Sequence, residues 1–251
     1  MGTRSTCRGV FALLLPLALA VARDAAAQPG TALTWNDCFL GVAAGDLFFD
    51  CATDAGQEEL FCALRLQQPT DGVIALECVV DLQHADPALP DWWQLGSGGC
   101  RAGTLTASAD YSGLSACADP WGGAGSATIQ QYQVGAPRGA PNQVRILAVS
   151  FVPSPSAASL DATSTYYAAR VIILNGKTTG LPACAGCVGG ACLVLNSILV
   201  RRLPGSGGDV YLETPVAAGA NWATWRGGSG ASCSAVPARR STWGALKSLY
   251  R

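Results

Sequence analysis

The sequence predicts an all-β fold: a single-domain β-sandwich, jelly-roll-like, stapled by disulfide bonds and closed by a short C-terminal helix. Three observations indicate this class. Short segments rich in β-branched and aromatic residues recur along the chain, punctuated by Gly, Pro, Ser and Asp. No helical period of useful length interleaves them before the C-terminus. Hydrophobic residues make up 49% of the chain, which is enough for a sizeable core.

Nine segments have the composition of strands. Three of them, VRILAVSFV, ARVIILNG and CLVLNSILV, are apolar on both faces, as strands central to a sandwich are. A helical turn is expected at DPALPDWWQL, and VPSPSAASLD (152–161) is the best linker candidate. Apolar strands flank that linker, so we interpret it as a loop within one fold. The predicted strands are 47–51, 59–67, 72–83, 105–111, 127–134, 144–152, 166–174, 191–200 and 210–214.

Residues 1–27 have the layout of a secretory signal peptide. Arg4 and Arg8 provide a positive start, residues 10–22 form an apolar run, and RDAAAQ offers an Ala-x-Ala cleavage site. A membrane anchor needs about 20 apolar residues, and this run is shorter. We therefore expect a secreted or cell-surface protein that begins at Gln28 and has no transmembrane segment after cleavage.

The charge of the mature chain excludes some partners. Of 16 basic and 17 acidic residues, Arg4, Arg8, Arg23 and Asp24 lie in the leader, so 13 and 16 remain, a net charge of −3. No polybasic signature is present, and we expect no nucleic-acid partner. The mature chain is expected to form one domain, 28–240, followed by a tail, 241–251.

The cysteine count predicts a disulfide framework. Cys7 leaves with the signal peptide, and ten of the eleven cysteines remain, an even set in an oxidising compartment. The firmest predicted bond joins Cys62 and Cys78. If segments 59–67 and 72–83 form a hairpin about the QPTDG turn, these two residues lie directly opposite, with Cα atoms about 5 Å apart.

The other cysteines are assigned less directly. Cys38–Cys51 and Cys100–Cys117 are expected as local loop closures, which leaves four cysteines to satisfy one another in an open pairing. A zinc site is conceivable for these four thiolates, although their spacing is not a standard ligand spacing. CAGC lacks the βαβ context of a thioredoxin-like motif. The four are Cys184, Cys187, Cys192 and Cys233.

Candidate catalytic groups are sparse. His84 is the only histidine, so a Ser-His-Asp triad would have to use it, yet nothing resembling G-x-S-x-G occurs. Paired carboxylates for glycoside hydrolysis are available but not selected by spacing. A calcium site stays unassigned because no D-x-D-x-D run is present. We therefore expect no enzyme, cofactor or metal. The available carboxylates are Asp91, Asp110, Asp119 and Glu213.

Seven tryptophans are an excess that suggests binding. Trp92, Trp93 and Trp121 lie in Pro/Asp/Gly-rich segments, where binding residues tend to reside. Exposed rings there would stack on sugars, which predicts an extracellular glycan partner. The alternative is that these rings pack in the core or on disulfides. Adjacent Trp92 and Trp93 would face opposite ways on a strand, so at most one could join a flat platform.

The C-terminal RRSTWGALKSLYR differs from the rest of the chain. Ser241 or Thr242 can cap a helix on which Trp243, Leu246 and Tyr250 form one apolar stripe. One interpretation is a helix that closes the sandwich. The other is a recognition tag read by export or surface-attachment machinery, and the sequence leaves both open.

Several motifs resemble a group of secreted bacterial proteins whose activity is not established. They are LTWNDC (33–38), LPDWWQL (89–95), GCR (99–101), CADPW (117–121), CAGC with VLNSI (184–198) and the terminal TWGALKSLYR. This resemblance spans nearly the whole mature chain and implies a bacterial extracellular setting, with no activity attached. Relative to the group, Cys62 and Cys78 are an addition. We expect a structural or interaction protein, with a carbohydrate-binding module second and a secreted hydrolase third.

Overall fold

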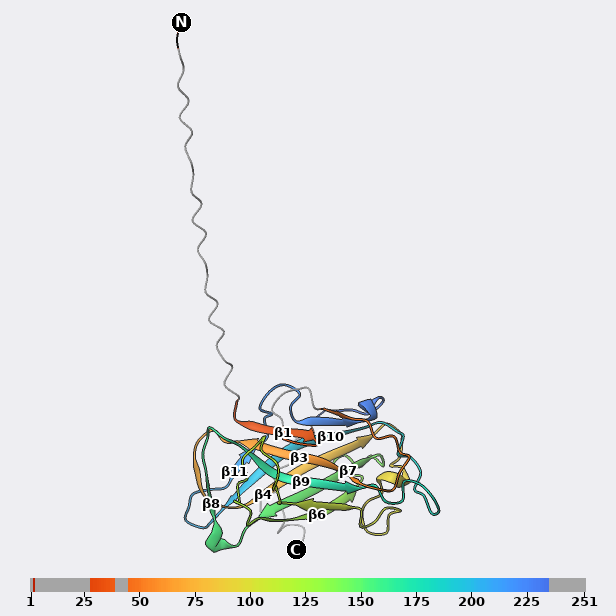
Figure 1. The fold of residues 1–251 in the computed structure, drawn as a ribbon, viewed down its shortest axis with the longest axis horizontal. Helices are drawn as coiled ribbons and strands as arrows, with labels where there is room; N and C mark the ends of the chain where they lie inside the picture. Colours follow the sequence, from red (N-terminus) through yellow and green to blue (C-terminus); the bar gives the residue numbers. More distant parts are fainter. Residues whose placement is uncertain (1, 3–27, 39–44, 235–251) are drawn as a thin grey trace.

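The computed structural model describes residue 2, residues 28–38 and residues 45–234. Two β-sheets pack face to face over this part of the chain, which confirms the predicted all-β sandwich (Figure 1). The expected signal peptide at residues 1–27 and the expected tail at 241–251 lie almost wholly outside the described residues.

The smaller sheet has four strands. Its strand β9 is central, and β3 is buried over most of its length. In order across the sheet, the strands are β1 (Gly30–Trp35), β3 (Gln57–Arg65), β9 (Thr165–Leu174) and β5 (Leu105–Ser108).

The larger sheet has eight strands. Six follow one another, and β11 (Val210–Leu212) and β8 (Ala158–Leu160) pair with β10 and β4 respectively. The six are β2 (Asp46–Leu47), β12 (Trp222–Trp225), β10 (Ala191–Arg202), β4 (Thr70–His84), β7 (Gln143–Phe151) and β6 (Ser126–Val134). Within the described ranges, three short 3-10 helices interrupt the loops: η2 (Asp91–Trp93), η3 (Ser154–Ser156) and η4 (Arg226–Gly228).

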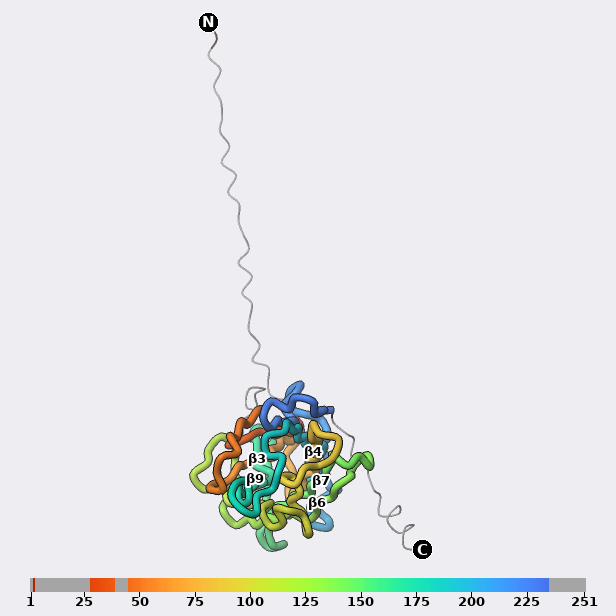
Figure 2. The backbone as a smooth tube through the Cα atoms, turned by 90° about the vertical axis from the view of Figure 1, so that its right-hand side faces the viewer, coloured from red at the N-terminus to blue at the C-terminus, as the bar shows by residue number. Residues whose placement is uncertain are grey.

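The core fills the space between the sheets. Figure 2 shows β3 and β9 on one side of this space and β4, β7 and β6 on the other. In β4 alternate residues face inward with exposed fractions of 0–1%, namely Leu76, Cys78, Val80 and Leu82. This period of two is what the sequence pattern predicted for the strand.

Most predicted strands lie where expected, with ends that differ by a few residues. The segment 47–51 is the exception, since only Asp46–Leu47 is a strand there. Three strands, β1, β8 and β12, had not been predicted. The helical turn expected in DPALPDWWQL is η2, which confirms that prediction.

The predicted hairpin between residues 59–67 and 72–83 is wrong. Strand β3 pairs with β1 and β9 in the smaller sheet, whereas β4 pairs with β7 and β10 in the larger sheet. The connection at residues 66–69 therefore carries the chain from one sheet to the other. Residues that would be neighbours in a hairpin face each other across the core instead.

The predicted disulfide pairing is also wrong. Cys62 and Cys78 are both buried free thiols, one from each sheet. The local closures Cys38–Cys51 and Cys100–Cys117 are absent as well, because each cysteine meets a partner that the fold brings in from a distant loop. The four bonds are Cys38–Cys117, Cys51–Cys187, Cys100–Cys184 and Cys192–Cys233.

The segment CAGCVGGAC, residues 184–192, is a covalent junction. Its three cysteines bond to three different partners, at sequence separations of 84, 136 and 41 residues. Of the last four cysteines, Cys192 and Cys233 therefore bond to each other as expected, whereas Cys184 and Cys187 bond to Cys100 and Cys51. With their sulfurs in disulfides, neither a zinc site nor a thioredoxin-like dithiol exists at this segment.

The two core thiols make a specific prediction about reactivity. Cys62 and Cys78 are each 0% exposed, and burial, followed by contact with Cys62, raises the pKa of the Cys78 thiol. Thiolate is the reactive form, so alkylation of either residue requires the core to open. We expect labelling by iodoacetamide to be at least about a thousandfold slower in the native protein than in denaturant.

Intact-mass analysis without reductant provides the check. Two labels are expected on the mature chain after denaturation, and none on the native chain over the same time. A denatured chain that accepts no label would show that these sulfurs are bonded and would contradict this assignment.

Candidate functional site

The tryptophans predicted as a ligand platform are buried. Trp92 and Trp93 are 0% exposed and Trp121 is 6% exposed. The indole N–H of Trp121 donates to the hydroxyl of Ser150 at 3.2 Å in the interior. The predicted binding role of these three residues is therefore wrong, and the alternative of core packing holds.

The rings of Trp92 and Trp93 belong to an aromatic cluster at one end of the sandwich. The centroids of Trp92 and Trp225 are 4.9 Å apart, and those of Trp93 and Trp225 are 5.4 Å apart. Phe49 and Trp35 pack on Trp225 from other directions, with centroids at 5.6 and 6.0 Å. Because η2 is a helical turn rather than a strand, both tryptophans point inward.

Arg101 lies inside this end of the molecule with 0% of its surface exposed. Its guanidinium carbon sits 3.7 Å from the centroid of the Trp92 ring, a cation–π arrangement. Its nitrogens donate to the carbonyls of Trp92 and Gly176 at 3.0 Å each, and to the carbonyl of Leu174. Burial lowers the pKa of Arg101 to about 10, so the group stays protonated at neutral pH.

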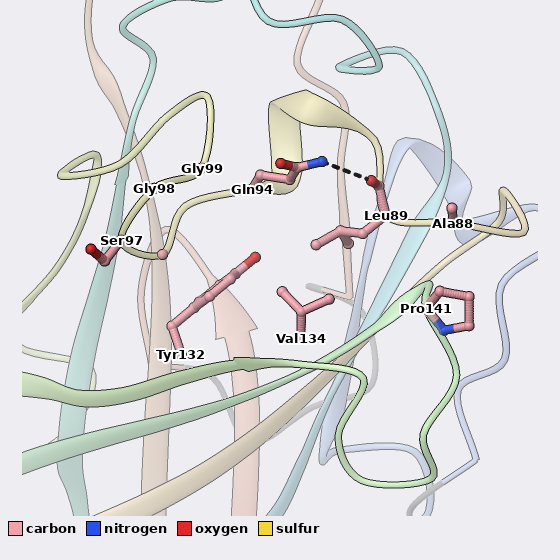
Figure 3. Close-up of a pocket in the computed structure, with 10 residues that line it drawn as sticks. Ala88, Leu89, Gln94, Ser97, Gly98, Gly99, Tyr132, Val134 and Pro141 are labelled. Atoms are coloured by element: carbon pink, nitrogen blue, oxygen red, sulfur yellow. Dashed lines mark hydrogen bonds between the residues drawn. The ribbon is translucent and has the colours of Figure 1, made fainter.

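An open pocket lies outside this cluster, where β6 faces the segment that carries η2. Its volume is about 530 Å³. Figure 3 shows Tyr132 and Val134 reaching from β6 toward Leu89 and Gln94 on that segment. Pro141 and a glycine-rich turn complete the wall, and the lining residues are Ala88, Leu89, Gln94, Gly96, Ser97, Gly98, Gly99, Tyr132, Val134 and Pro141.

Tyr132 is held firmly in the wall of this pocket. Its hydroxyl donates to the carbonyl of Trp93, and burial raises the pKa of the phenol. A Cβ atom at Gly96 would lie 2.8 Å from the Tyr132 ring, so glycine lets the turn close over the ring. The pocket and the aromatic cluster are thereby joined through η2.

The polar groups of the pocket are all neutral. The side-chain amide nitrogen of Gln94 donates to the carbonyl of Leu89 at 3.3 Å and to a carboxylate oxygen of Asp91 at 3.1 Å. The amide oxygen of Gln94 takes no part in these two bonds. Ser97 adds an exposed hydroxyl. None of the ten lining residues carries a carboxylate or a cationic group.

The residues of this pocket were not identified from the sequence. Two signals existed: the GSGG run at residues 96–99, and the alternation that places Tyr132 and Val134 on one face of a strand. Neither signal says that the end of β6 meets the loop after β4, because that meeting depends on tertiary packing.

The carboxylates considered for hydrolysis act locally in turns. Asp119 accepts the backbone N–H groups of Trp121 and Gly123 at 2.8 and 2.7 Å. Asp110 accepts the N–H of Ser112 at 2.9 Å, and Asp91 binds the Gln94 amide. Glu213 lies exposed beyond β11.

His84 is buried at the end of β4, with 0% of its surface exposed. Its Nδ1 accepts the backbone N–H of Asp86 at 3.0 Å, and the Asp86 carboxylate lies 3.5 Å away. A Cβ atom at Gly189 would lie 2.6 Å from Nε2, so the junction segment covers the ring. Burial lowers the pKa of His84 more than Asp86 raises it.

The described residues contain no group of three or more His, Cys, Asp or Glu side chains placed to hold a metal ion. They also contain no helix that combines the length and hydropathy needed to cross a bilayer. The apolar stripe expected at Trp243, Leu246 and Tyr250 lies outside them.

Comparison of the chain with protein-family models, with curated protein sequences and with solved structures gives no match.

Replacement of Arg101 tests the aromatic end of the core. Arg101→Met keeps an unbranched chain of similar length but removes the donor from the buried carbonyl of Trp92 and from the part-buried carbonyls of Gly176 and Leu174. An unsatisfied buried group costs about 1–3 kcal/mol and the cation–π contact with Trp92 is lost as well, so we expect the free energy of unfolding to fall by at least about 2 kcal/mol. Guanidinium unfolding followed by tryptophan fluorescence, with the disulfides intact, measures it.

A matched substitution on the surface gives the control. Arg201→Met removes exposed ion pairs with Glu77 and Asp209, which are worth about 0–1 kcal/mol. Equal losses at positions 101 and 201 would contradict the role assigned to Arg101.

His84 predicts a dependence of stability on pH. Because the folded pKa is lowered, the unfolded chain binds more protons than the folded chain just below pH 6.5. The stabilisation is complete above about pH 6.5 and is lost as the pH falls toward the lowered folded pKa.

Unfolding titrations between pH 7.5 and about 5.5 measure this loss. His84→Asn retains an acceptor for the Asp86 N–H and lacks the titrating group. Since the chain has one histidine, we expect a flatter profile for this variant. Parallel profiles for the two proteins would rule out His84 as the cause.

Proposed function

We propose that this protein works outside the cytoplasm as a non-catalytic binding module, and that the pocket between β6 and the η2 segment takes one sugar unit of a neutral glycan. The observation that carries the proposal is the chemistry of the pocket wall, which combines a fixed tyrosine ring and aliphatic side chains with neutral hydrogen-bonding groups. Such a site suits an uncharged, hydroxylated ligand.

The covalent framework supports the extracellular setting. Four disulfide bonds persist in oxidising compartments and are rare in the cytosol. The sequence of residues 1–27, which resembles a secretory signal peptide, also supports an extracellular setting.

The chemistry of the wall favours a sugar over a charged ligand. A sugar ring has an apolar C–H face, which can contact Tyr132, Leu89 and Val134. Its hydroxyls can donate to the amide oxygen of Gln94 and exchange hydrogen bonds with Ser97. An anionic or cationic ligand would lose hydration here without gaining an opposite charge.

The expected affinity is low. At about 0.3 kcal/mol per non-hydrogen atom, a hexose of about 12 such atoms gains about 4 kcal/mol, which corresponds to a millimolar dissociation constant. Useful binding would then come from several modules acting on one polymer. A stable, weakly binding module requires no catalytic group, which agrees with carboxylates that serve turns and a histidine that is buried.

Substitution at the mouth of the pocket tests the proposal. Val134 is 51% exposed, so Val134→Glu should leave the fold intact while placing a charge against the bound sugar. We expect the mature protein to bind at least one neutral oligosaccharide on an array or by calorimetry, and this variant to bind at least about tenfold more weakly.

The control places the same charge elsewhere. Val188 is 67% exposed on the junction segment, and Val188→Glu should bind like the unaltered protein. The proposal fails if no neutral glycan binds, or if both variants bind as the unaltered protein does.

A further inference from the structure

The pocket beside β6 has two chemically different ends. Figure 3 shows the glycine-rich turn after η2 on one side of the Tyr132 ring and aliphatic side chains on the other. We call Ser97, Gly98 and Gly99 the polar end. We call Ala88, Leu89, Val134 and Pro141 the aliphatic end. A ligand that fills both ends therefore carries a hydroxylated part and an apolar part.

The polar end offers hydrogen-bonding groups to hydroxyls. Its turn closes with the N–H of Gly99 donating to the carbonyl of Gly96 at 3.0 Å. The N–H groups of Ser97 and Gly98 take no part in that bond, and both residues are exposed. Gly98 has φ 78°, a conformation that favours glycine, and a Cβ atom there would meet nothing within 4 Å. A sugar can therefore approach the backbone of this turn as closely as the hydroxyl of Ser97.

The aliphatic end presents carbon atoms only. Ala88 and Pro141 are exposed, and Val134 is 51% exposed, so apolar surface stays in contact with water there. Covering this surface with an apolar group of a ligand is favourable, because it removes both apolar surfaces from water. Ring hydroxyls alone would gain nothing at this end of the pocket.

Gln94 lies where the two ends meet (Figure 3). Its amide nitrogen donates to the carbonyl of Leu89 at 3.3 Å and to the carboxylate of Asp91 at 3.1 Å. Both N–H groups of the amide are thus engaged, and its oxygen is the group left for a ligand. An amide oxygen only accepts hydrogen bonds, so the ligand needs a donor at this point, next to its apolar group.

One class of neutral sugar joins these two features. An acetamido group connects an N–H donor to a methyl group through a single carbonyl carbon. A free amino sugar is cationic and has no apolar group for the aliphatic end, and a uronic acid is anionic. Neither would find an opposite charge among the lining residues.

We infer that the pocket selects an N-acetylhexosamine. The acetamido N–H donates to the amide oxygen of Gln94, the acetyl methyl group contacts Leu89 and Val134, and ring hydroxyls occupy the polar end. This inference rests on the proposed function and names the sugar that the same pocket takes. The volume of about 530 Å³ lies within the usual range for small-molecule sites, which leaves room for the acetyl group.

NMR titration of the mature protein tests the selectivity. The probes are the methyl β-glycosides of N-acetylglucosamine and N-acetylgalactosamine, each matched with the glycoside of glucose or galactose, in which a hydroxyl replaces the acetamido group. The hydroxyl can still donate to Gln94, whereas burial of the methyl group is worth about fourfold in affinity. We expect at least one N-acetylated glycoside to bind at least about fourfold more tightly than its match.

Saturation transfer from the protein to the bound glycoside locates the acetyl group. We expect the acetyl methyl protons to receive the strongest saturation, because they contact Leu89 and Val134. Val134→Thr replaces one methyl group of the wall with a hydroxyl at an exposed position, so the selectivity should fall at least about twofold. Val188→Thr makes the same change on the junction segment, at a side chain that is 67% exposed, and should keep the selectivity of the unaltered protein.

The outcomes separate this inference from the proposed function. If the N-acetylated glycosides bind no more tightly than their matches, or if other neutral glycans bind and these do not, the inference fails and the proposed function stands. Equal selectivity in Val134→Thr and Val188→Thr would overturn the position assigned to the acetyl group. If no neutral glycan binds, both proposals fail.

Discussion

The buried guanidinium of Arg101 is the interaction on which one end of the sandwich depends. A charged side chain is tolerated in the interior only when other groups compensate for its lost hydration. Here three carbonyls accept hydrogen bonds from the guanidinium and the Trp92 ring lies against it. The carbonyls come from η2, from the end of β9 and from the loop after β9, so one side chain fixes three segments. Because Tyr132 hydrogen-bonds to the same η2 turn, the pocket wall is positioned by this arrangement as well.

The sulfur atoms divide into two populations with different environments. The disulfides join loops and strand ends, and they close loops of 41 to 136 residues. In the chain-entropy description such long loops lose much freedom in the unfolded state when they are closed. Cys62 and Cys78, by contrast, behave as small apolar side chains within the core.

The sequence predicted most of the strands, but it did not predict which strands and loops pack against one another. Alternation in β4 and β7 identified strands and their inward faces, because the period of two is a local property. The same alternation predicted a hairpin for 59–67 and 72–83, since facing residues match equally well within a sheet or across a core. Trp92 and Trp93 were expected at the surface because they lie among turn residues, but Trp225, more than a hundred residues away, buries them. The pocket at Tyr132 was not predicted either, because it depends on the packing of β6 against the loop after β4.

Because three disulfide bonds meet at residues 184–192, correct pairing there depends on an even number of cysteines. Removing both members of a pair, such as Cys51 and Cys187, deletes one tether and leaves the other three. Removing Cys187 alone leaves Cys51, a half-buried sulfur, without its partner at a junction that carries two further disulfide bonds. A thiolate there can attack a neighbouring disulfide or a second molecule, so an odd count invites scrambling and covalent oligomers that an even count avoids.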